Sequence, residues 1–472
     1  MSDAGSANAW LRTSNRDAYI SSLPNEILAF IFTRGQYMTR TAKFPSSLQS
    51  DSESAEDDSL TLKFEVALSH VTSHWRNVAI NEPFLWNNIC VSSRSSLDEL
   101  IAYLERSRKC LLNLRLDLGQ NAIGNLGMHL LTSHVGRWRT LSTESNGEVR
   151  NDALLTHLRN LAAPNLVHIS MSVNALKHLE LMPNNIDDPF PQIFTGGAPV
   201  LSFVRLACHA LSFFRPPLTA MTTLHLDQTS HLPMSYTRFC QVITASPALT
   251  NLSIYGDMIG TEAWPLMANS IELPALRSLR ICGIGGLVYC GVLLNISAPG
   301  LESLILKDVL HNDLDQLWDS PQMFKFPVLQ SLTFCGFECT ESTYRKFFSA
   351  FPTVTHFTSL HSSLYNPRVL KLVGAINSPI LLGTPLPWPK LHTMSLLFNL
   401  TDEASLVAVV NTRIHQKHPI AKLRLGMGGE RNTPRAFRLV QWLQKHLQVE
   451  WFSVVDPWPI GLQYVDEDDV LF

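Results

Sequence analysis

One frame recurs along the chain from about residue 110. It consists of an apolar residue, two intervening positions, a second apolar residue, one intervening position and a third apolar residue. From Met221 to Val354, successive copies start 28, 27, 25, 28 and 25 residues apart. Self-similarity at such a period predicts a repeat architecture, because each copy is one small unit that stacks on the next. Clear copies start at Leu111, Leu166, Leu201, Met221, Leu249, Leu276, Leu301, Leu329 and Leu391, and weaker copies start at Trp138, Val354 and Ile420.

A proline usually stands two residues before the frame, as at Pro247, Pro274 and Pro299. Its fixed φ and missing N–H end the preceding helical segment and begin an extended one. Each frame then predicts a short strand with apolar side chains on one face, and neighbouring strands must stack in parallel to bury that face. Proline, frame and period together are typical of leucine-rich repeats. The expected fold class is therefore α/β, a curved parallel sheet with helices on its convex side.

The spacing is irregular in two places. Copies are 35 residues apart between Leu166 and Leu201, and 37 residues apart between Val354 and Leu391. We expect projecting loops there, for example over residues 183–199. An extra, compressed copy within the first gap is an open alternative; it would use Leu176, Leu179 and Leu181.

Composition narrows the class of protein. A chain that is 45% hydrophobic and 16% charged can bury a large core, which excludes a wholly disordered protein. With 37 basic and 40 acidic residues, the net charge is −3, and the absence of an overall cationic field argues against bulk nucleic-acid binding. Eight irregularly spaced cysteines are too sparse for a disulfide scaffold, so we expect reduced thiols in the core.

Neither a secretory signal nor a membrane span is expected. The first twenty residues lack the continuous apolar stretch that a signal peptide needs. The longest apolar run, residues 287–296, is much shorter than the roughly 20 residues that cross a bilayer. We therefore expect a protein of the cytoplasm, the nucleus or both.

Ahead of the repeats, the segment SSLPNEILAFIF over residues 21–32 predicts a helix with Ser22 as its N-cap. So broad an apolar surface indicates that the helix is covered on two sides. A second segment, residues 64–89, predicts two short helices that Pro83 ends. The first helix carries Leu23, Ile27, Phe30 and Ile31 on one stripe, which Leu28 and Phe32 widen, and the second segment carries Val66, Leu68, Val71, Trp75, Val78 and Ala79.

These segments together resemble an F-box, with the patterns L-P-x-E-I-L-x-x-I-F, V-x-x-x-W-R-x-x-A and P-x-L-W-x-x-I. Ser73 stands where a cysteine often precedes the W-R pair, and an insertion separates the first helix from the second. With the repeats included, residues 18–460 resemble the F-box and leucine-rich-repeat proteins of fungi. The matching residues are Leu23, Pro24, Glu26, Ile27, Leu28, Ile31, Phe32, Val71, Trp75, Arg76, Ala79, Pro83, Leu85, Trp86 and Ile89.

The expected organisation has four parts. Residues 1–17 form a disordered N-terminus, residues 18–90 the F-box, residues 91–460 the solenoid and residues 461–472 an acidic tail. An insertion over about residues 34–60 contains SSLQSDSESAEDDS, whose acidic, non-aromatic composition predicts a disordered loop. Phosphorylation of its serines and a passive spacer are both open interpretations.

The resemblance implies a partner: F-box proteins dock this module on a Skp-family adaptor and, through it, on a cullin-RING ubiquitin ligase. A module this small has little interior of its own, and an exposed apolar stripe suits a partner's groove. The alternative is that the stripe packs on the first repeat. The residues expected to bind the adaptor are Leu23, Pro24, Ile27, Leu28, Ile31, Phe32, Val71 and Trp75.

The outward-pointing strand positions of a repeat solenoid form its concave face, a long surface suited to a target protein. Tyrosine and arginine dominate binding energy at many interfaces, and both occur there. The sequence names no target and no degron. The strand alternation places His168, Arg205, His225, Asp227, Tyr255, Arg280, Lys307 and Arg424 on this face.

No motif for catalysis, cofactor binding or metal binding stands out. His70 and His74 have the i, i+4 spacing of metal ligands on a helix, but no zinc-protease pattern accompanies them. The cysteines lack the C-x-x-C knuckle. We therefore expect a non-catalytic adaptor subunit of a ubiquitin ligase, without cofactor or metal; the alternative is a repeat scaffold with no ligase role.

Overall fold

The computed structural model describes most of the chain. The possible extra repeat at Leu176, Leu179 and Leu181, the expected N-cap Ser22 and both expected terminal segments lie outside the described residues. The described residues are 20, 23–42, 63–92, 95–118, 124–145, 148–173, 193–208, 210, 214–227, 234–256, 258–259, 264–265, 269–283, 286–310, 312–318, 326–337, 339–360, 376, 386–397, 403–426 and 433–452.

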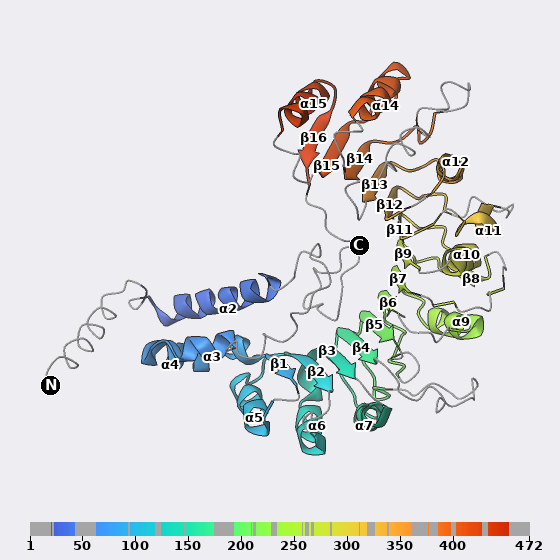
Figure 1. Ribbon diagram of the computed structural model, residues 1–472. Helices are drawn as coiled ribbons and strands as arrows, with labels where there is room; N and C mark the ends of the chain where they lie inside the picture. The colour runs from blue at the N-terminus through green and yellow to red at the C-terminus, as the bar shows by residue number, and fades with distance from the viewer. Residues whose placement is uncertain are drawn as a thin grey trace.

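Fourteen strands form one parallel sheet in chain order, and the sheet curves into an arc (Figure 1). A separate pair, β8 (Ile271–Glu272) and β10 (Ile296–Ser297), forms a two-stranded sheet. The predicted α/β fold with a long parallel sheet is confirmed. The strands of the arc are β1 (Asn88–Val91), β2 (Leu112–Leu118), β3 (Trp138–Ser145), β4 (His168–Val173), β5 (Phe203–Cys208), β6 (Thr223–Asp227), β7 (Asn251–Tyr255), β9 (Ser278–Cys282), β11 (Ser303–Lys307), β12 (Ser331–Cys335), β13 (His356–Leu360), β14 (Thr393–Leu397), β15 (Lys422–Gly426) and β16 (Gln448–Trp451).

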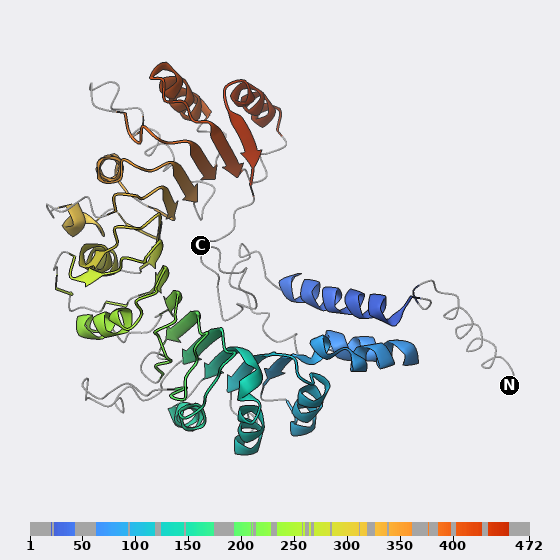
Figure 2. The same ribbon diagram turned by 180° about the vertical axis from the view of Figure 1, so that it is seen from behind.

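Helices line the outer, convex side of the arc, and Figure 2 shows the same arrangement from behind. Several begin at a serine or threonine N-cap whose hydroxyl accepts a hydrogen bond from the backbone N–H three residues on, as Ser96, Ser235, Thr340 and Thr433 do. The outer helices are α5 (Leu97–Arg106), α6 (Gly124–Thr132), α7 (Glu148–Leu158), α9 (Tyr236–Thr244), α10 (Gly286–Asn295), α11 (Asp315–Trp318), α12 (Glu341–Ala350), α14 (Glu403–His415) and α15 (Pro434–Gln444), with the 3-10 turn η3 (Val135–Arg137).

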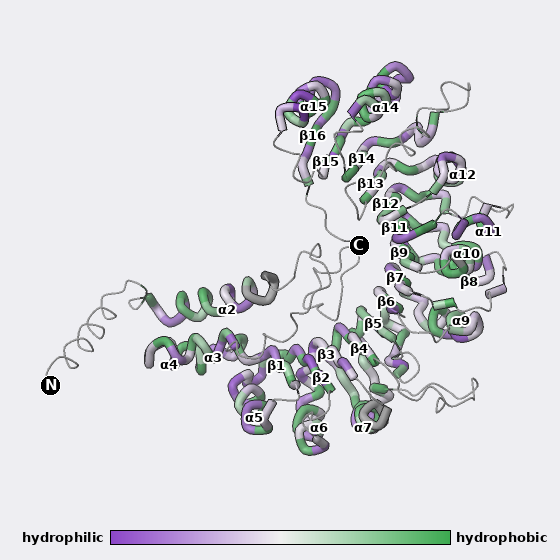
Figure 3. The backbone as a smooth tube through the Cα atoms, viewed as in Figure 1, coloured by the Kyte–Doolittle hydropathy of each residue, from purple (hydrophilic) through white to green (hydrophobic). Residues whose placement is uncertain are grey.

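The core consists of apolar ladders that run from strand to strand. In β9, β11 and β12, Leu279, Leu304 and Leu332 lie in register and are fully buried. The next apolar position along each strand forms a second ladder in the same way, so the frame seen in the sequence is the core of the solenoid-like stack. Figure 3 shows this apolar character recurring along the strands.

Each copy of the repeated proline occupies a β-turn that leads into one of the strands. The N–H of Leu301 donates to the carbonyl of Ala298 across Pro299, at 3.0 Å. Proline is favoured at this second position of a turn, because its fixed φ already fits. Equivalent bonds of 2.9 to 3.4 Å span Pro164, Pro199, Pro247, Pro274, Pro327, Pro352 and Pro389.

One copy of the frame starts a residue later than the sequence suggests. Leu111 is 41% exposed, whereas Leu112, at the start of β2, is fully buried. Because side chains alternate between the two faces of a strand, the burial of Leu114 and Leu116 requires Leu112 on the same side. The prediction that Leu111 belongs to the core is therefore wrong.

At the β1 end of the arc lie α2 (Asn25–Ala42), α3 (Phe64–Ser69), α4 (Ser73–Asn81) and the 3-10 turn η2 (Pro83–Trp86) (Figure 1). The start of the sheet corrects one predicted boundary. Ile89, which the sequence assigns to the helical module, lies in β1 and pairs with Leu114 of β2.

A second boundary also differs. The predicted insertion begins at residue 34, but α2 continues as a helix to Ala42. Contacts with α3 explain the difference, because Gln36 is buried and a Cβ added to Gly35 would lie 2.8 Å from the Phe64 ring. Tertiary packing therefore prolongs a helix that composition alone would end.

No helix among the described residues is both long and apolar enough to span a membrane. All eight cysteines are free thiols, and the four that are buried are Cys282, Cys290, Cys335 and Cys339.

Candidate partner-binding surfaces

Helix α2 has an inward apolar face. Leu28, Phe32 and Gln36, spaced four residues apart, are each 5% exposed or less. The Phe32 ring packs on Trp75 of α4, with ring centroids 4.9 Å apart. This face holds the N-terminal helices together.

The same helix has an outward apolar face. We call Ile27, Phe30, Ile31 and Met38 the exposed stripe; their exposed fractions are 47%, 68%, 42% and 62%. Positions separated by three, four and eleven residues fall on one side of a helix. Helix α2 is thus apolar on two sides, and every side chain of the exposed stripe is at least 42% exposed.

The structure divides the eight residues predicted to bind the adaptor. Leu28 and Phe32 are buried within the helical module, so their role is to hold α2 in place. Leu23 and Trp75 are half-buried. The other four are exposed: Pro24, Ile27, Ile31 and Val71. Their binding role stays a prediction.

A buried polar network that was not predicted from the sequence joins these helices to the parallel sheet and its outer helices. The Gln36 amide donates to Glu65 at 2.9 Å and to the Leu85 carbonyl at 3.0 Å. The Tyr103 hydroxyl of α5 donates to the other oxygen of Glu65. Burial raises the pKa of Tyr103, and the nearby Glu65 carboxylate raises it further. We call Gln36, Glu65 and Tyr103 the seam; a polar residue within an otherwise apolar helix face was its only sequence signal.

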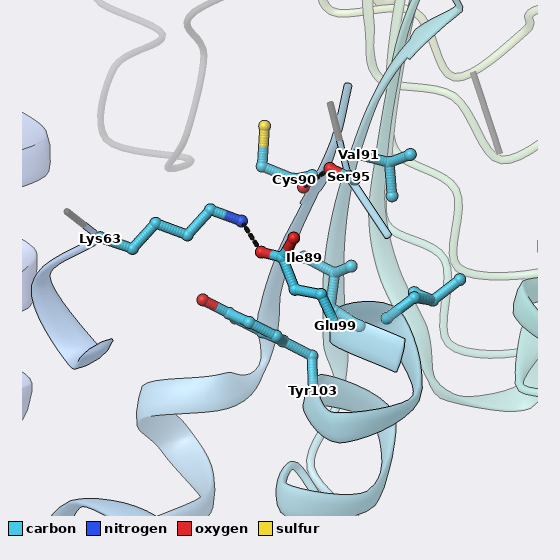
Figure 4. Close-up of a pocket in the computed structure, with 8 residues that line it drawn as sticks. Lys63, Ile89, Cys90, Val91, Ser95, Glu99 and Tyr103 are labelled. Atoms are coloured by element: carbon cyan, nitrogen blue, oxygen red, sulfur yellow. Dashed lines mark hydrogen bonds and ion pairs between the residues drawn. The ribbon is translucent and has the colours of Figure 1, made fainter. Parts of the chain in front are cut away.

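Figure 4 shows the outer edge of the seam, where Lys63 reaches Glu99 at 2.5 Å. The Lys63 ammonium also lies 5.1 Å from the centroid of the Tyr103 ring. The cavity beside them measures about 10 Å³, which is space for about one water molecule. It is too small to be a ligand site.

The inner face of the sheet carries the other predicted surface. Arg205 of β5, His225 of β6, Ser253 of β7 and Arg280 of β9 are register partners across four adjacent strands. The alternation places them on the inner face as predicted, but they are not solvent-exposed: Arg205 is 5% exposed, and His225 and Arg280 are 1% exposed. His168 and Asp227 are buried too, Tyr255 and Lys307 are half-buried, and Arg424 is exposed.

Contacts between neighbouring strands contribute to this burial. Phe203 lies between His168 and His225, with ring centroids 4.1 Å and 5.1 Å away. The Arg205 guanidinium pairs with Asp227, with Nε 2.5 Å from Oδ2. The sequence pattern indicates the direction of a side chain but not how closely its neighbours enclose it.

Burial also sets the charge states of this cluster. Desolvation, helped by the positive charge of Arg205, lowers the pKa of His168 to about 3. The pKa of His225 is lowered for the same reason, with Arg280 and Arg205 adding to the effect. Burial raises the pKa of Asp227, while Arg205 opposes that rise. Both histidines are therefore neutral near pH 7, and the arginines supply the positive charge.

The remaining chemistry in the described part of the chain is sparse. No three His, Cys, Asp or Glu side chains there are grouped so as to hold a metal ion. His70 follows the last residue of α3, and His74 lies in α4, so the pair does not share a helix; the His74 Nε2 instead lies 2.8 Å from the Asn25 side chain. No protein-family model matches the chain, and no curated protein is detectably similar to it.

Proposed function

We propose that this protein is the substrate-recognition subunit of a cullin-RING ubiquitin ligase of the SCF type. In this proposal the N-terminal helices are an F-box that binds a Skp-family adaptor, and the parallel sheet is a leucine-rich-repeat solenoid that presents a target protein. The chain itself forms and breaks no bond. It acts by raising the effective concentration of a target lysine near a ubiquitin carrier held elsewhere in the complex.

One observation carries the proposal: α2 is apolar on two sides, and among the described residues one side is buried while the other is exposed. Leu28 and Phe32 are buried, while Ile27 and Ile31 are 47% and 42% exposed. Clustered exposed apolar side chains on a helix are typical of a surface that another protein covers.

Burial of the exposed stripe would contribute to the free energy of association. Full burial of an isoleucine, phenylalanine or methionine side chain contributes roughly 1.5–3 kcal/mol. The four residues of the exposed stripe could together offset much of the several kcal/mol that association costs. Introducing a carboxylate into the covered stripe would add a desolvation penalty and weaken binding strongly.

The test uses the full chain and a purified Skp-family adaptor, followed by size-exclusion chromatography and calorimetry. Wild type should form a one-to-one complex. Ile27→Asp with Ile31→Asp should weaken it by at least about a hundredfold, because two central anchors are lost.

A matched control changes exposed apolar residues elsewhere. Leu126 and Phe437 are 67% and 64% exposed. They belong to α6 and α15, which lie on the convex side of the arc. Leu126→Asp with Phe437→Asp should leave the complex intact. If folded wild type binds no adaptor, or if the α2 variant binds as well as wild type, the ligase proposal fails and a repeat scaffold is favoured.

A further inference from the structure

Two histidines on neighbouring outer helices lie against each other. His129 of α6 and His157 of α7 have ring centroids 4.9 Å apart, and their ring planes meet at 87°. His129 is exposed and His157 is half-buried, so solvent and dissolved ions reach the pair. Both helices line the convex side of the arc (Figure 1).

The imidazole nitrogens of this pair are available as ligands. Within the described part of the chain, neither ring forms a hydrogen bond or an ion pair, and the contact of each is with the other ring. Burial lowers the pKa of His157, and His129 lowers it further. The His157 imidazole is therefore neutral near pH 7, which is the form that binds a metal ion.

The separation of the rings fits a shared ion. Zinc–nitrogen bonds are about 2.0–2.1 Å long and an imidazole nitrogen lies about 1.1 Å from its ring centre, so two rings on one tetrahedral ion have centroids about 5.2 Å apart. At the right angle of a square-planar Cu²⁺ site, the same distances give about 4.5 Å. The 4.9 Å between His129 and His157 lies between these two values. Rotation about χ2, which is broad in histidine, turns a nitrogen of each ring toward such an ion.

The ends of the two helices also favour a cation here. His129 and His157 each lie in the last turn of their helix. The C-terminus of a helix carries a partial negative charge, which stabilises a positive ion near the last turn. Among the described residues, no Asp, Glu or Cys joins the two rings to make a group of three, so water would complete the coordination of an ion.

We propose that His129 and His157 form a two-ligand site for a divalent transition-metal ion such as Zn²⁺, and that the ion links α6 to α7. Imidazole nitrogen suits Zn²⁺, Cu²⁺ and Ni²⁺, and two protein ligands bind more weakly than the four of a structural zinc site. Because α6 and α7 follow the successive strands β2 and β3, a bound ion stabilises the contact between two neighbouring strand–helix units. The site does not rest on the proposed function.

The sequence gives this pair no motif. The two histidines are 28 residues apart, which matches the period of the apolar frame rather than the i, i+4 spacing of ligands on one helix. Only the stacking of one unit on the next brings them together.

The first experiment measures binding to the full chain. The probe is Cu²⁺ bound to iminodiacetate, because this chelator occupies part of the coordination sphere and leaves room for two adjacent imidazoles. Wild type should bind one ion at this site, with an electron paramagnetic resonance spectrum that shows two imidazole nitrogens. His129→Gln and His157→Gln should each bind at least about tenfold more weakly, since the second imidazole of wild type acts at a high effective concentration.

The matched control removes two other exposed histidines. His415 ends α14 and His446 follows α15, so His415→Gln with His446→Gln changes the same residue type at the ends of two other outer helices. This variant should keep the affinity of wild type. If either single variant binds the probe as tightly as wild type, or if the control loses as much affinity, scattered histidines explain the binding and the proposal is wrong.

The second experiment uses ZnCl₂ alone and follows amide hydrogen exchange. Zn²⁺ should slow exchange in α6 and α7 of wild type, and a chelator should reverse the change. In His129→Gln, Zn²⁺ should leave the exchange of both helices unaltered. Equal slowing in wild type and His129→Gln would place the ion elsewhere and overturn the site.

Discussion

Tyr103 of α5 donates a hydrogen bond to Glu65 of α3, linking the first outer helix of the parallel sheet to the N-terminal helices. Gln36 of α2 completes the seam from the other side. If the N-terminal helices bind a ligase and the sheet binds a target, this link fixes the distance between the two. The seam therefore contributes to the stability of the protein and to the distance between the N-terminal helices and the sheet.

Removing one donor from the seam should destabilise the protein. Tyr103→Phe leaves the buried Glu65 carboxylate with one fewer hydrogen bond, and a buried group that loses a partner costs about 1–3 kcal/mol. We expect the free energy of unfolding in urea to fall by that amount. Tyr236→Phe is the control: its hydroxyl contacts Ser270 at 2.6 Å in an exposed setting, and its loss should cost less. Equal losses of unfolding free energy in Tyr103→Phe and Tyr236→Phe would mean that the seam hydrogen bond stabilises the protein no more than an exposed hydrogen bond does.

The two faces of α2 should respond differently to truncation. Phe32→Ala removes a fully buried ring and should cost about 3–5 kcal/mol. Ile31→Ala removes a side chain that is 42% exposed and should change stability by less than about 1 kcal/mol. Thermal unfolding of the full chain measures both. A large loss for Ile31→Ala would indicate that the chain itself covers the exposed stripe.

Buried neutral histidines make stability depend on pH. The pKa of His168 is about 3 in the folded protein, against about 6.5 when unfolded, so the unfolded state binds more protons between those values. The stabilisation is complete above pH 6.5 and is lost as the pH falls. At pH 5 the loss from this residue is at most about 2 kcal/mol.

His168→Phe should reduce this pH dependence, because a phenyl ring can stack on Phe203 without titrating. The comparison is the change in unfolding free energy between pH 7 and pH 5, with the exposed His415→Gln as the control. His225, next to Arg205 and Arg280, keeps part of the dependence in the variant. An unchanged slope in His168→Phe would show that His168 does not titrate on unfolding.

The sequence alone predicts the parts of this structure that repeat. Leu279, Leu304 and Leu332 follow from the frame, and the β-turn at Pro299 follows from the recurring proline. Period-two alternation also places Arg205 and Arg280 on the inner face. Each of these inferences needs only local geometry, which the chain repeats many times.

Features that depend on single contacts between distant segments are not predictable in this way. Gln36 meets Glu65 across 29 residues of sequence, and no periodicity signals that pairing. The length of α2 depends on its packing against Phe64. The burial of Arg280 depends on what encloses it, which alternation does not specify.

Arg413 makes further contacts of this kind, and they are the basis of the last prediction. It lies in α14 and is 1% exposed. Its guanidinium donates to the carbonyls of Pro387 at 3.0 Å, Trp388 at 2.9 Å and His418 at 3.1 Å. Through these hydrogen bonds, the planar guanidinium links the turn before β14 to the end of α14. Desolvation lowers its pKa to about 10, so it stays charged at neutral pH.

Arg413→Lys keeps the positive charge but loses the planar guanidinium and its directed hydrogen bonds. A lysine cannot reach the three carbonyls in this geometry, and unpaired buried carbonyls beside a buried ammonium should cost about 2–4 kcal/mol. We expect a lower unfolding midpoint in urea and faster hydrogen exchange in β14 and β15. The control is Arg435→Lys, since Arg435 is exposed and pairs with Glu403 at 2.7 Å, a contact worth less than about 1 kcal/mol. A similar stability for Arg413→Lys and wild type would show that charge alone, rather than the directed hydrogen bonds, holds this turn.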